Sequence, residues 1–380
     1  MTRSVLHVQW KGHVGGAERA VFQLARHQHR EGRRRVALGF GQASGPYADL
    51  AREAGIPVVD FALSSGRDLR ALPRARRLFA QFDIHHFHVA DPVLLLASLA
   101  SGSATRIYTH RGGTMTYAGR RLWRYRIAAR LVPRFDAITG TRQAAAAVQQ
   151  VFGISSDAVL PTFNGLDFSL LDPTGTRERL RAEHGVAPGT VIVGTAANLR
   201  AWKRIDWLIE AAGELSADCA IWIIGDGQDR PRLEALAARS PAADRIRFLG
   251  MQVRIGEWLR CLDVFVLPSN SVETFGNAVV EAMACGLPTV VSADCPAHLQ
   301  HIEPGRTGLV VRDPHELAAC LQRLLDDPGL RSRIGPAGMS SVRRNYTMAR
   351  AAESFEAVYR GVEDSASTGP TPLSGREIAG

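Results

Sequence analysis

Short apolar runs rich in Val and Ile alternate with helix-length stretches along the whole chain, a pattern typical of βαβ units and parallel sheets. In the first half this pattern predicts strands at Ser4–Trp10, Arg35–Phe40, Pro57–Leu63, Asp83–Val89, Arg106–His110, Ala137–Thr141 and Ala158–Phe163. In the second half it predicts strands at Val191–Ala196, Ala220–Gly225, Arg245–Leu249, Asp263–Pro268, Pro288–Ser292 and Gly308–Val311. The expected fold is therefore α/β, with two doubly wound sheets whose facing strand ends form a cleft for a ligand.

A polar stretch with Pro and Gly, about Asp172–Thr190, is the best candidate for a domain boundary. It separates a domain of about residues 1–170 from one of about 171–345, and 380 residues are enough for two domains. A further helix is expected over about 346–363. The residues from 364 to 380, rich in Ser, Thr and Pro, are expected to form a disordered tail.

Composition excludes several classes of protein. With 46% hydrophobic and 22% charged residues the chain is neither mainly disordered nor a coiled coil. No apolar run reaches the roughly 18–20 residues that cross a bilayer, and no signal-peptide core follows the first Met. The five cysteines are odd in number and none forms a CxxC pair, which argues against a disulfide framework and a zinc site. The expected compartment is the cytosol.

Positive charge is concentrated in the first half. Residues 1–170 hold 23 Lys and Arg against 11 Asp and Glu, whereas the whole chain holds 46 against 37. The only lysines are Lys11 and Lys203, so the excess is almost entirely arginine. Such a half could face nucleic acid, an anionic membrane or a phosphorylated substrate, although genomic bias would explain the choice of Arg over Lys.

A glycine-rich turn follows the first expected strand. Its sequence, Lys11-Gly12-His13-Val14-Gly15-Gly16-Ala17-Glu18, leads into positions with helical spacing. A turn of this kind exposes backbone amides at a helix N-terminus and can hold an anion. It matches neither GxGxxG nor the Walker A pattern, which argues against NAD binding and ATP hydrolysis. The glycines could equally serve only to make a tight turn.

Two carboxylates accompany a helix expected in the second half. Glu273 stands just before it, Thr274 is a plausible N-cap, Glu281 lies about two turns further along, and Gly286 with Pro288 ends it. Carboxylates so placed could hold sugar and ribose hydroxyls while the helix N-terminus takes phosphate. They could also be one exposed acid and one acid that interacts with the helix dipole. Spacing alone leaves both interpretations open.

The segment LPS-x3-ETFGN-x3-EAMACGLP, with Glu273-x7-Glu281, resembles the hallmark of family-4 glycosyltransferases, which are retaining enzymes with two facing Rossmann-like domains (the GT-B fold). The resemblance extends over nearly the whole chain. It includes Gly15-Gly16-Ala17-Glu18, Tyr108-Thr109-His110, Asn164-Gly165-Leu166-Asp167, Leu199-Arg200-Ala201-Trp202-Lys203, Gly225-Asp226-Gly227, Phe248-Leu249-Gly250 and Gly305-Arg306-Thr307-Gly308.

The resemblance implies a role for each matching residue. Glu281 should bind the ribose of a nucleotide, and Glu273 should lie at the donor sugar. Lys203 should pair with the diphosphate, and His110 should lie at the reacting centre. The remaining donor-binding residues are expected to be the turn that closes over the diphosphate from the first domain and the start of the second-domain helix: Gly15, Gly16, Thr274, Phe275, Gly276 and Asn277. The resemblance also implies that the C-terminal helix packs back on the first domain.

The chain departs from the family pattern in three places. Ala197-Asn198-Leu199 replaces the usual Gly-Arg-Leu, so the second phosphate cation is missing there, and Arg200 could substitute for it. Arg204 replaces the usual glycine after the lysine. The loop Ala293–His298 replaces a Gly-Gly-x-x-Glu pattern, which leaves the sugar preference open.

These observations predict a retaining glycosyltransferase that moves a hexose-type sugar from a nucleoside-diphosphate sugar, most plausibly of UDP or GDP, to a hydroxyl of a glycan or lipid-linked acceptor. Its expected context is cell-surface polysaccharide, lipopolysaccharide or glycolipid biosynthesis. No cofactor is implied, and no DxD-type carboxylate cluster indicates a metal. A nucleotide-sugar epimerase and a non-catalytic sugar-nucleotide-binding partner of another transferase remain alternatives. A pyridoxal-phosphate phosphorylase is disfavoured because Lys203 is the only lysine of the second half.

A basic helix is expected in the first half. Residues Gly119–Arg134 contain six arginines with Trp123 and Tyr125, and the Arg120–Arg134 region resembles a helix that lies in a membrane interface. Arginines over residues 67–77 and 33–35 add further basic stretches. The interpretation that competes equally is a solvated helix of the acceptor domain. We expect a cytoplasmic protein, peripheral at the inner face of the cytoplasmic membrane, with no nucleic-acid partner.

Overall fold

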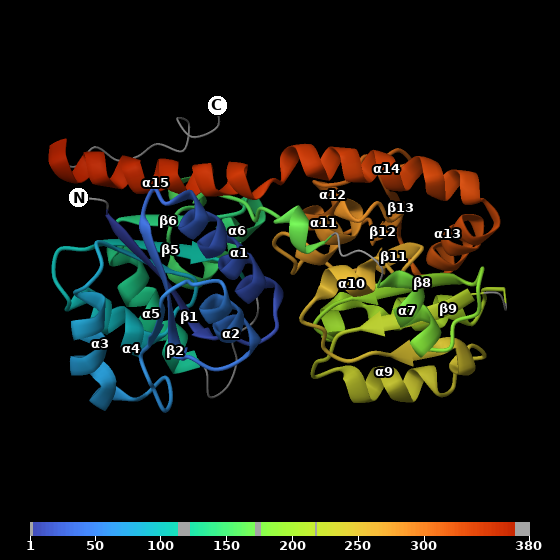
Figure 1. Cartoon of the computed structure of the whole chain (residues 1–380), viewed down its shortest axis with the longest axis horizontal. Coiled ribbons are helices and arrows are strands. Elements are labelled where there is room, and N and C mark those ends of the chain that lie inside the picture. Colours follow the sequence, from blue (N-terminus) through green and yellow to red (C-terminus); the bar gives the residue numbers. More distant parts are fainter. Residues whose placement is uncertain (1–2, 113–121, 172–175, 217–218, 369–380) are drawn as a thin grey trace. The chain divides into compact units, whose positions relative to one another are not determined.

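Two sheets of parallel strands, one in each of two structural units, form the framework of the chain (Figure 1). The computed structural model describes residues 3–112, 122–171, 176–216 and 219–368. Unit 1 consists of Met1–Gly165 and Met348–Gly380, and unit 2 of Leu166–Thr347. The fold of each unit is the expected doubly wound, Rossmann-like α/β fold.

In unit 1 the seven strands are ordered β3-β2-β1-β4-β5-β6-β7. The strands are β1 (Ser4–Lys11), β2 (Arg35–Gln42), β3 (Val58–Asp60), β4 (Ile84–Phe87), β5 (Thr105–His110), β6 (Ala137–Gly140) and β7 (Val159–Pro161). The helices are α1 (Gly16–Glu31), α2 (Pro46–Glu53), α3 (Leu72–Phe79), α4 (Pro92–Leu99), α5 (Leu122–Leu131), α6 (Arg142–Phe152) and α15 (Met348–Thr368).

In unit 2 the six strands are ordered β10-β9-β8-β11-β12-β13. The strands are β8 (Val191–Ala196), β9 (Cys219–Ile224), β10 (Ile246–Phe248), β11 (Val264–Leu267), β12 (Thr289–Ser292) and β13 (Leu309–Val311). The helices are α7 (Arg177–Glu183), α8 (Ile205–Ala212), α9 (Arg230–Ala237), α10 (Ile255–Leu259), α11 (Asn277–Ala284), α12 (Pro296–Leu299), α13 (Pro314–Asp326) and α14 (Pro328–Asn345).

All strands expected from the hydrophobic pattern are present, and the largest difference is in β3. The expected strand Pro57–Leu63 is reduced to Val58–Asp60 because Ala62 adopts a left-handed backbone, with φ of 47°. The Asp60 side chain accepts a hydrogen bond from the Ala62 amide at 2.8 Å, which supports this turn.

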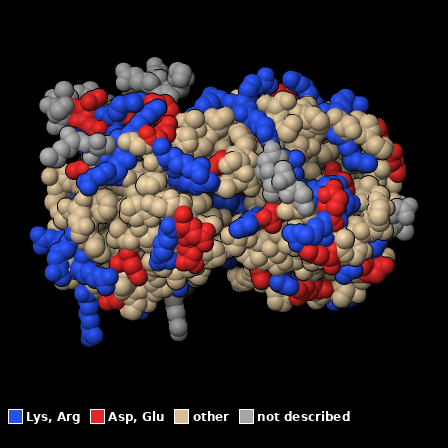
Figure 2. All heavy atoms as spheres, in the orientation of Figure 1, with Lys and Arg blue, Asp and Glu red and all other residues tan. Residues whose placement is uncertain are grey.

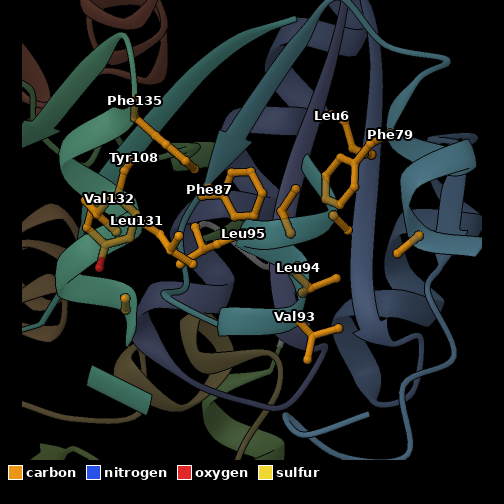
Figure 3. Packing of buried hydrophobic residues seen from close by; sticks show 14 of the residues in the cluster. Leu6, Phe79, Phe87, Val93, Leu94, Leu95, Tyr108, Leu131, Val132 and Phe135 are labelled. Carbon is orange, nitrogen blue, oxygen red and sulfur yellow. The ribbon is translucent and has the colours of Figure 1, made fainter. Parts of the chain in front are cut away.

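Alternate residues along the strands of unit 1 face opposite layers of helices, as the two-residue repeat of a strand requires. Tyr108 and Ile138 face a core cluster formed with helices α3 to α6, part of which is shown in Figure 3. Their neighbours Ile107 and Ala137 face the opposite layer, where α15 packs with Phe355 and other apolar side chains.

Charge pairs accompany the apolar contacts of α15. Arg34, which precedes β2, donates to Glu356 at 2.8 Å and to Glu363 at 2.9 Å. Its side chain is only 10% exposed, and its guanidinium lies 5.2 Å from the Tyr359 ring centroid. The helix continues to Thr368, so the first residues of the expected disordered tail are helical, and the rest of that tail lies outside the described residues.

The stretch that was expected to link the domains is part of unit 2 in its described residues. It contains α7, whose first residue Arg177 donates to Asp263 at 2.5 Å. The units divide between Gly165 and Leu166 instead. A polar, glycine-containing segment can form an outer helix as easily as a linker, and periodicity does not distinguish the two.

The basic helix α5 packs into the core of unit 1. Ala128, Leu131 and Val132 are buried in the same cluster as the strands. Arg124 pairs with the fully buried Asp91 at 2.5 Å, and Trp123 packs under the guanidinium of Arg67. The side of α5 that carries Ala128, Leu131 and Val132 therefore packs against the protein itself rather than against a membrane. Residues 119–121 lie outside the described residues, and among the rest no helix is long and apolar enough to cross a membrane.

Replacing Arg34 by Ala should destabilise unit 1 by about 3 kcal/mol, because it leaves the buried carboxylate of Glu356 without its cation. Hydrogen–deuterium exchange of α15 across a urea series measures this change. The control is Arg33→Ala, which removes an adjacent but solvent-exposed pair with Glu353 and should leave the unfolding midpoint unchanged. Equal midpoints for both variants and the unmodified chain would contradict a stabilising role for Arg34.

Candidate functional site

The loop between β11 and α11 brings the candidate donor-site residues of unit 2 to the carboxyl end of a buried strand. Helix α11 begins at Asn277, and Gly276 precedes it with a left-handed backbone, φ 84°. The expectation that Thr274 caps this helix is wrong, because the left-handed Gly276 takes the N-cap position and delays the start of the helix. A Cβ atom on Gly276 would lie 2.4 Å from the His298 ring, so this position requires glycine for space as well as for conformation.

Lys203 and Glu273, both predicted catalytic residues, form an ion pair in which each side chain is less than 15% exposed. Lys203 follows β8 and Glu273 follows β11, and these strands are neighbours in the sheet. The Lys203 ammonium also lies 4.3 Å from the centroid of the Trp202 ring. Burial alone would raise the pKa of Glu273, but Lys203 and His298 hold it far below its ordinary value. Glu273 is therefore an anion at neutral pH.

Two histidines that the sequence interpretation did not assign support this loop. His298 is fully buried, with Nε2 3.9 Å from the Glu273 carboxylate, and burial lowers its pKa. His301 bonds the Phe275 carbonyl through Nε2 at 2.6 Å and the Tyr346 hydroxyl through Nδ1 at 2.8 Å. Their spacing of three residues was a visible signal, but spacing does not reveal which loop they contact.

The other candidate donor residues of unit 2 lie near this pair along the chain. Glu281 is buried on α11, four residues after Asn277 and therefore on the same helical face. Phe275 and Thr274 are buried in the loop. Arg200 donates to the side-chain oxygens of Asn198 at 3.3 Å and Gln228 at 3.2 Å, which are neutral amides rather than acids.

The remaining candidates belong to unit 1. Gly15 precedes α1 and Gly16 is its first residue. A Cβ atom on Gly15 would lie 2.2 Å from the Glu18 carboxylate, so the glycine leaves room for that side chain to fold back on the turn. Burial raises the pKa of Glu18. The side chain of Glu18, from the first turn of α1, therefore lies against the glycine-rich turn.

His110 is the last residue of β5 and is 5% exposed. Its Nδ1 lies 3.1 Å from the Tyr108 hydroxyl, whereas Nε2 has no hydrogen-bond partner among the described residues. Burial lowers the pKa of His110 to about 4, so its ring is neutral at pH 7. A neutral ring with one uncommitted nitrogen can accept or donate one hydrogen bond to a ligand.

In the part of the chain that the structure describes, one cluster has the spacing of metal ligands. His7, His86 and His88 each offer a ring nitrogen, and these atoms lie within 4.8 Å of one another. The nitrogens of His86 contact Tyr359 at 2.7 Å and Thr109 at 2.6 Å. His88 also accepts a hydrogen bond from the Arg111 guanidinium. A fixed positive charge in direct contact opposes a metal cation, so these residues fit a hydrogen-bonded network better than a metal centre.

Two family models match the chain. The model described as "Glycosyltransferase Family 4" matches residues 14–170, and "Glycosyl transferases group 1" matches residues 189–327. The matched ranges lie almost entirely in unit 1 and in unit 2, respectively.

Curated relatives are similar at about 30% identity. "D-inositol 3-phosphate glycosyltransferase 2" of Catenulispora acidiphila is 30% identical over 60% of this chain and 56% of the relative. "N-acetyl-alpha-D-glucosaminyl L-malate synthase" of Bacillus anthracis is 26% identical over 73% of this chain and 74% of the relative. "Lipopolysaccharide core biosynthesis glycosyltransferase LpsD" of Rhizobium meliloti is 33% identical over 42% and 46%. The chain spans about half the length of the first curated relatives that it matches.

Solved structures share the fold at lower identity. Alr3699/HepE of Anabaena, in complex with UDP and glucose, matches 94% of this chain and 100% of that chain, with a TM-score of 0.83 and 21% identity. WaaG, a glycosyltransferase involved in lipopolysaccharide biosynthesis, matches 92% and 98%, with a TM-score of 0.71 and 17% identity. One family model matches each of the two units, and each unit contains a Rossmann-like sheet. The chain therefore belongs to glycosyltransferase family 4 and has the GT-B fold.

Proposed function

We propose that this protein is a retaining glycosyltransferase that moves a hexose-type sugar from a nucleoside-diphosphate sugar to a hydroxyl of a glycan or lipid-linked acceptor. The observation that supports this most directly is the buried pair of Lys203 and Glu273 beside the start of α11. It combines a cation and a carboxylate with the N-terminus of a helix, and these are groups that can bind a diphosphate and a sugar hydroxyl. The solved relative from Anabaena holds UDP and glucose.

In the proposed reaction the bond between the sugar and the diphosphate breaks, so positive charge develops on the sugar and negative charge on the leaving diphosphate. Lys203, Arg200 and the amides at the start of α11 stabilise the leaving group. Removing one such preorganised donor typically costs about 2.7–4 kcal/mol of transition-state stabilisation. The acceptor attacks the face that the diphosphate leaves, and the departing phosphate takes its proton.

His110 and Glu273 are assigned to the sugar. His110 is neutral and keeps Nε2 available, so it can hydrogen-bond a sugar hydroxyl at the reacting centre. Glu273 stays ionised beside Lys203 and can accept hydrogen bonds from further hydroxyls. Glu281 accepts from the ribose. UDP or GDP is the proposed nucleotide, and the products belong to cell-surface polysaccharide, lipopolysaccharide or glycolipid.

Glu281→Ala should weaken binding of the nucleoside diphosphate about 10- to 150-fold, because hydrogen bonds to a charged acceptor contribute about 1.5–3 kcal/mol. Glu273→Ala should chiefly lower turnover. A thermal-shift panel of UDP, GDP and ADP first identifies the nucleotide, since a ligand at 100 times its Kd adds about 2.7 kcal/mol. Calorimetric titration of the variants follows.

The matched control is Glu214→Ala, which removes an exposed carboxylate of the same unit and should change neither quantity. Unchanged nucleotide affinity in Glu281→Ala would refute its ribose-binding role. The absence of stabilisation by all three nucleotides would refute the proposed donor class.

Activity should survive excess EDTA, because the proposed diphosphate site is built from cations and amides rather than from a bound divalent ion. NMR of the product should show the anomeric configuration of the donor. Loss of activity on chelation that added Mg²⁺ restores would refute metal independence, and an inverted anomer would refute the retaining mechanism.

Peripheral attachment to the inner face of the cytoplasmic membrane is proposed through charge alone, since Ala128, Leu131 and Val132 of the α5 region lie in the core. Figure 2 shows basic side chains gathered over the region of α3. The arginines there are exposed, and Leu69 beside them is 61% exposed. They are Arg67, Arg70, Arg74, Arg76 and Arg77.

Replacing Arg70, Arg76 and Arg77 together by Gln should lower binding to anionic vesicles by about two orders of magnitude, because each cation near such a surface contributes about 1 kcal/mol. Co-sedimentation with phosphatidylglycerol vesicles measures this. A control triple variant at Arg239, Arg247 and Arg254 removes equal charge from exposed positions of unit 2 and should bind normally. Equal recovery with neutral vesicles would eliminate the proposal.

A further inference from the structure

Arg111 directly follows His110 at the carboxyl end of β5, and its hydrogen-bond partners among the described residues are neutral. Its Nε donates to His88 Nδ1 at 3.0 Å, and its Nη1 donates to the Asn164 side-chain oxygen. Among the described residues no carboxylate forms an ion pair with it, and Nη2 makes no hydrogen bond. Arg111 is therefore a partly buried cation that the described protein orients but does not neutralise.

A directed chain of hydrogen bonds holds this guanidinium. Because His88 Nδ1 accepts from Arg111, the proton of His88 is on Nε2 and is donated to His7 Nδ1 at 3.0 Å. His7 then donates from Nε2 to the Gln28 oxygen at 2.8 Å. Burial lowers the pKa of both histidines, so each stays neutral and keeps this direction. The chain connects β5, β4, β1 and α1 and fixes the plane of the guanidinium.

An arginine removed from water without a carboxylate is costly, and buried charges in proteins are normally paired. Glu18 interacts electrostatically with Arg111 without forming an ion pair, and burial raises the pKa of that carboxyl. The described protein thus holds the Arg111 guanidinium in place without supplying a counter-ion for it. A planar guanidinium with a free nitrogen matches the two oxygens of a phosphate or carboxylate.

We propose that Arg111 binds an oxyanion, a phosphate or carboxylate group, carried by the acceptor substrate, and so restricts this enzyme to anionic acceptors. The inference rests on the proposed function, because it assumes that the acceptor meets the donor sugar at His110. The groups assigned to the donor diphosphate, Lys203 and Arg200, are cations of unit 2, whereas Arg111 belongs to unit 1. His88 and His7 are positioning residues for the guanidinium.

The test uses the full chain with inorganic phosphate as the probe, at constant ionic strength and with saturating UDP, so that the diphosphate site is already filled. Phosphate should bind the unmodified chain. In Arg111→Gln its affinity should fall at least tenfold while the affinity for UDP changes less than twofold. Arg111→Lys, which keeps the charge but not the fork, should lose part of the phosphate affinity. If Arg111→Gln does not fold, the phosphate affinity of Arg111→Lys is the measurement that tests the proposal.

The matched control is Arg106→Gln, at the other end of β5, where the guanidinium bonds backbone carbonyls of Ser98 and Ala104. It removes the same charge and should leave phosphate affinity unchanged. A tenfold loss of UDP affinity in the Arg111 variants would assign this residue to the donor and overturn the proposal. Unchanged phosphate affinity, or no phosphate binding by a chain that binds UDP, would also overturn it. A chain that binds GDP instead of UDP is tested in the same way with saturating GDP. Failure of the unmodified chain to bind UDP, GDP and ADP alike would instead refute the proposed function.

Discussion

Every pairing between the strands of both sheets is parallel, and this constraint decides where the candidate functional groups lie. Parallel pairing sends all carboxyl ends to one edge of a sheet, so residues far apart in sequence meet there. In unit 2, Lys203 follows β8 and Glu273 follows its neighbour β11, and the two form an ion pair. In unit 1, His88 and Arg111 follow the neighbouring strands β4 and β5 and are joined by a hydrogen bond.

The two units differ in whether a buried charge has a counter-ion: Glu273 in unit 2 has one, and Arg111 in unit 1 forms no ion pair among the described residues. In unit 2 the carboxylate of Glu273 is compensated within the protein by Lys203. In the proposed function this ion pair holds Lys203 in position before a substrate arrives, which is the preorganisation that electrostatic catalysis requires. In unit 1 the histidines around Arg111 orient its guanidinium while remaining neutral. A preorganised pair suits a charge that develops during a reaction, whereas an uncompensated cation suits a charge that the ligand brings with it.

Much of the arginine excess of unit 1 serves the fold itself. Arg34 attaches α15 to the sheet, Arg124 neutralises the buried Asp91, and Arg106 satisfies backbone carbonyls. The exposed arginines around α3 form no ion pair among the residues that the structure describes. Net charge alone therefore overstates the basic surface that a partner could meet.

The sequence by itself determined the thirteen strands, the two doubly wound sheets and the segments that contain the candidate site residues, because periodicity and glycine-rich turns are local properties. It did not determine that the helix after β11 starts at Asn277 or that α5 is a core helix. Nor did it determine that His298 lies beside Glu273, or that Arg111 bonds His88. Only the tertiary structure decided these, because burial and charge pairing depend on atoms that come from distant parts of the chain. Hydrophobic spacing records that a side chain is buried, but not which group it is buried against.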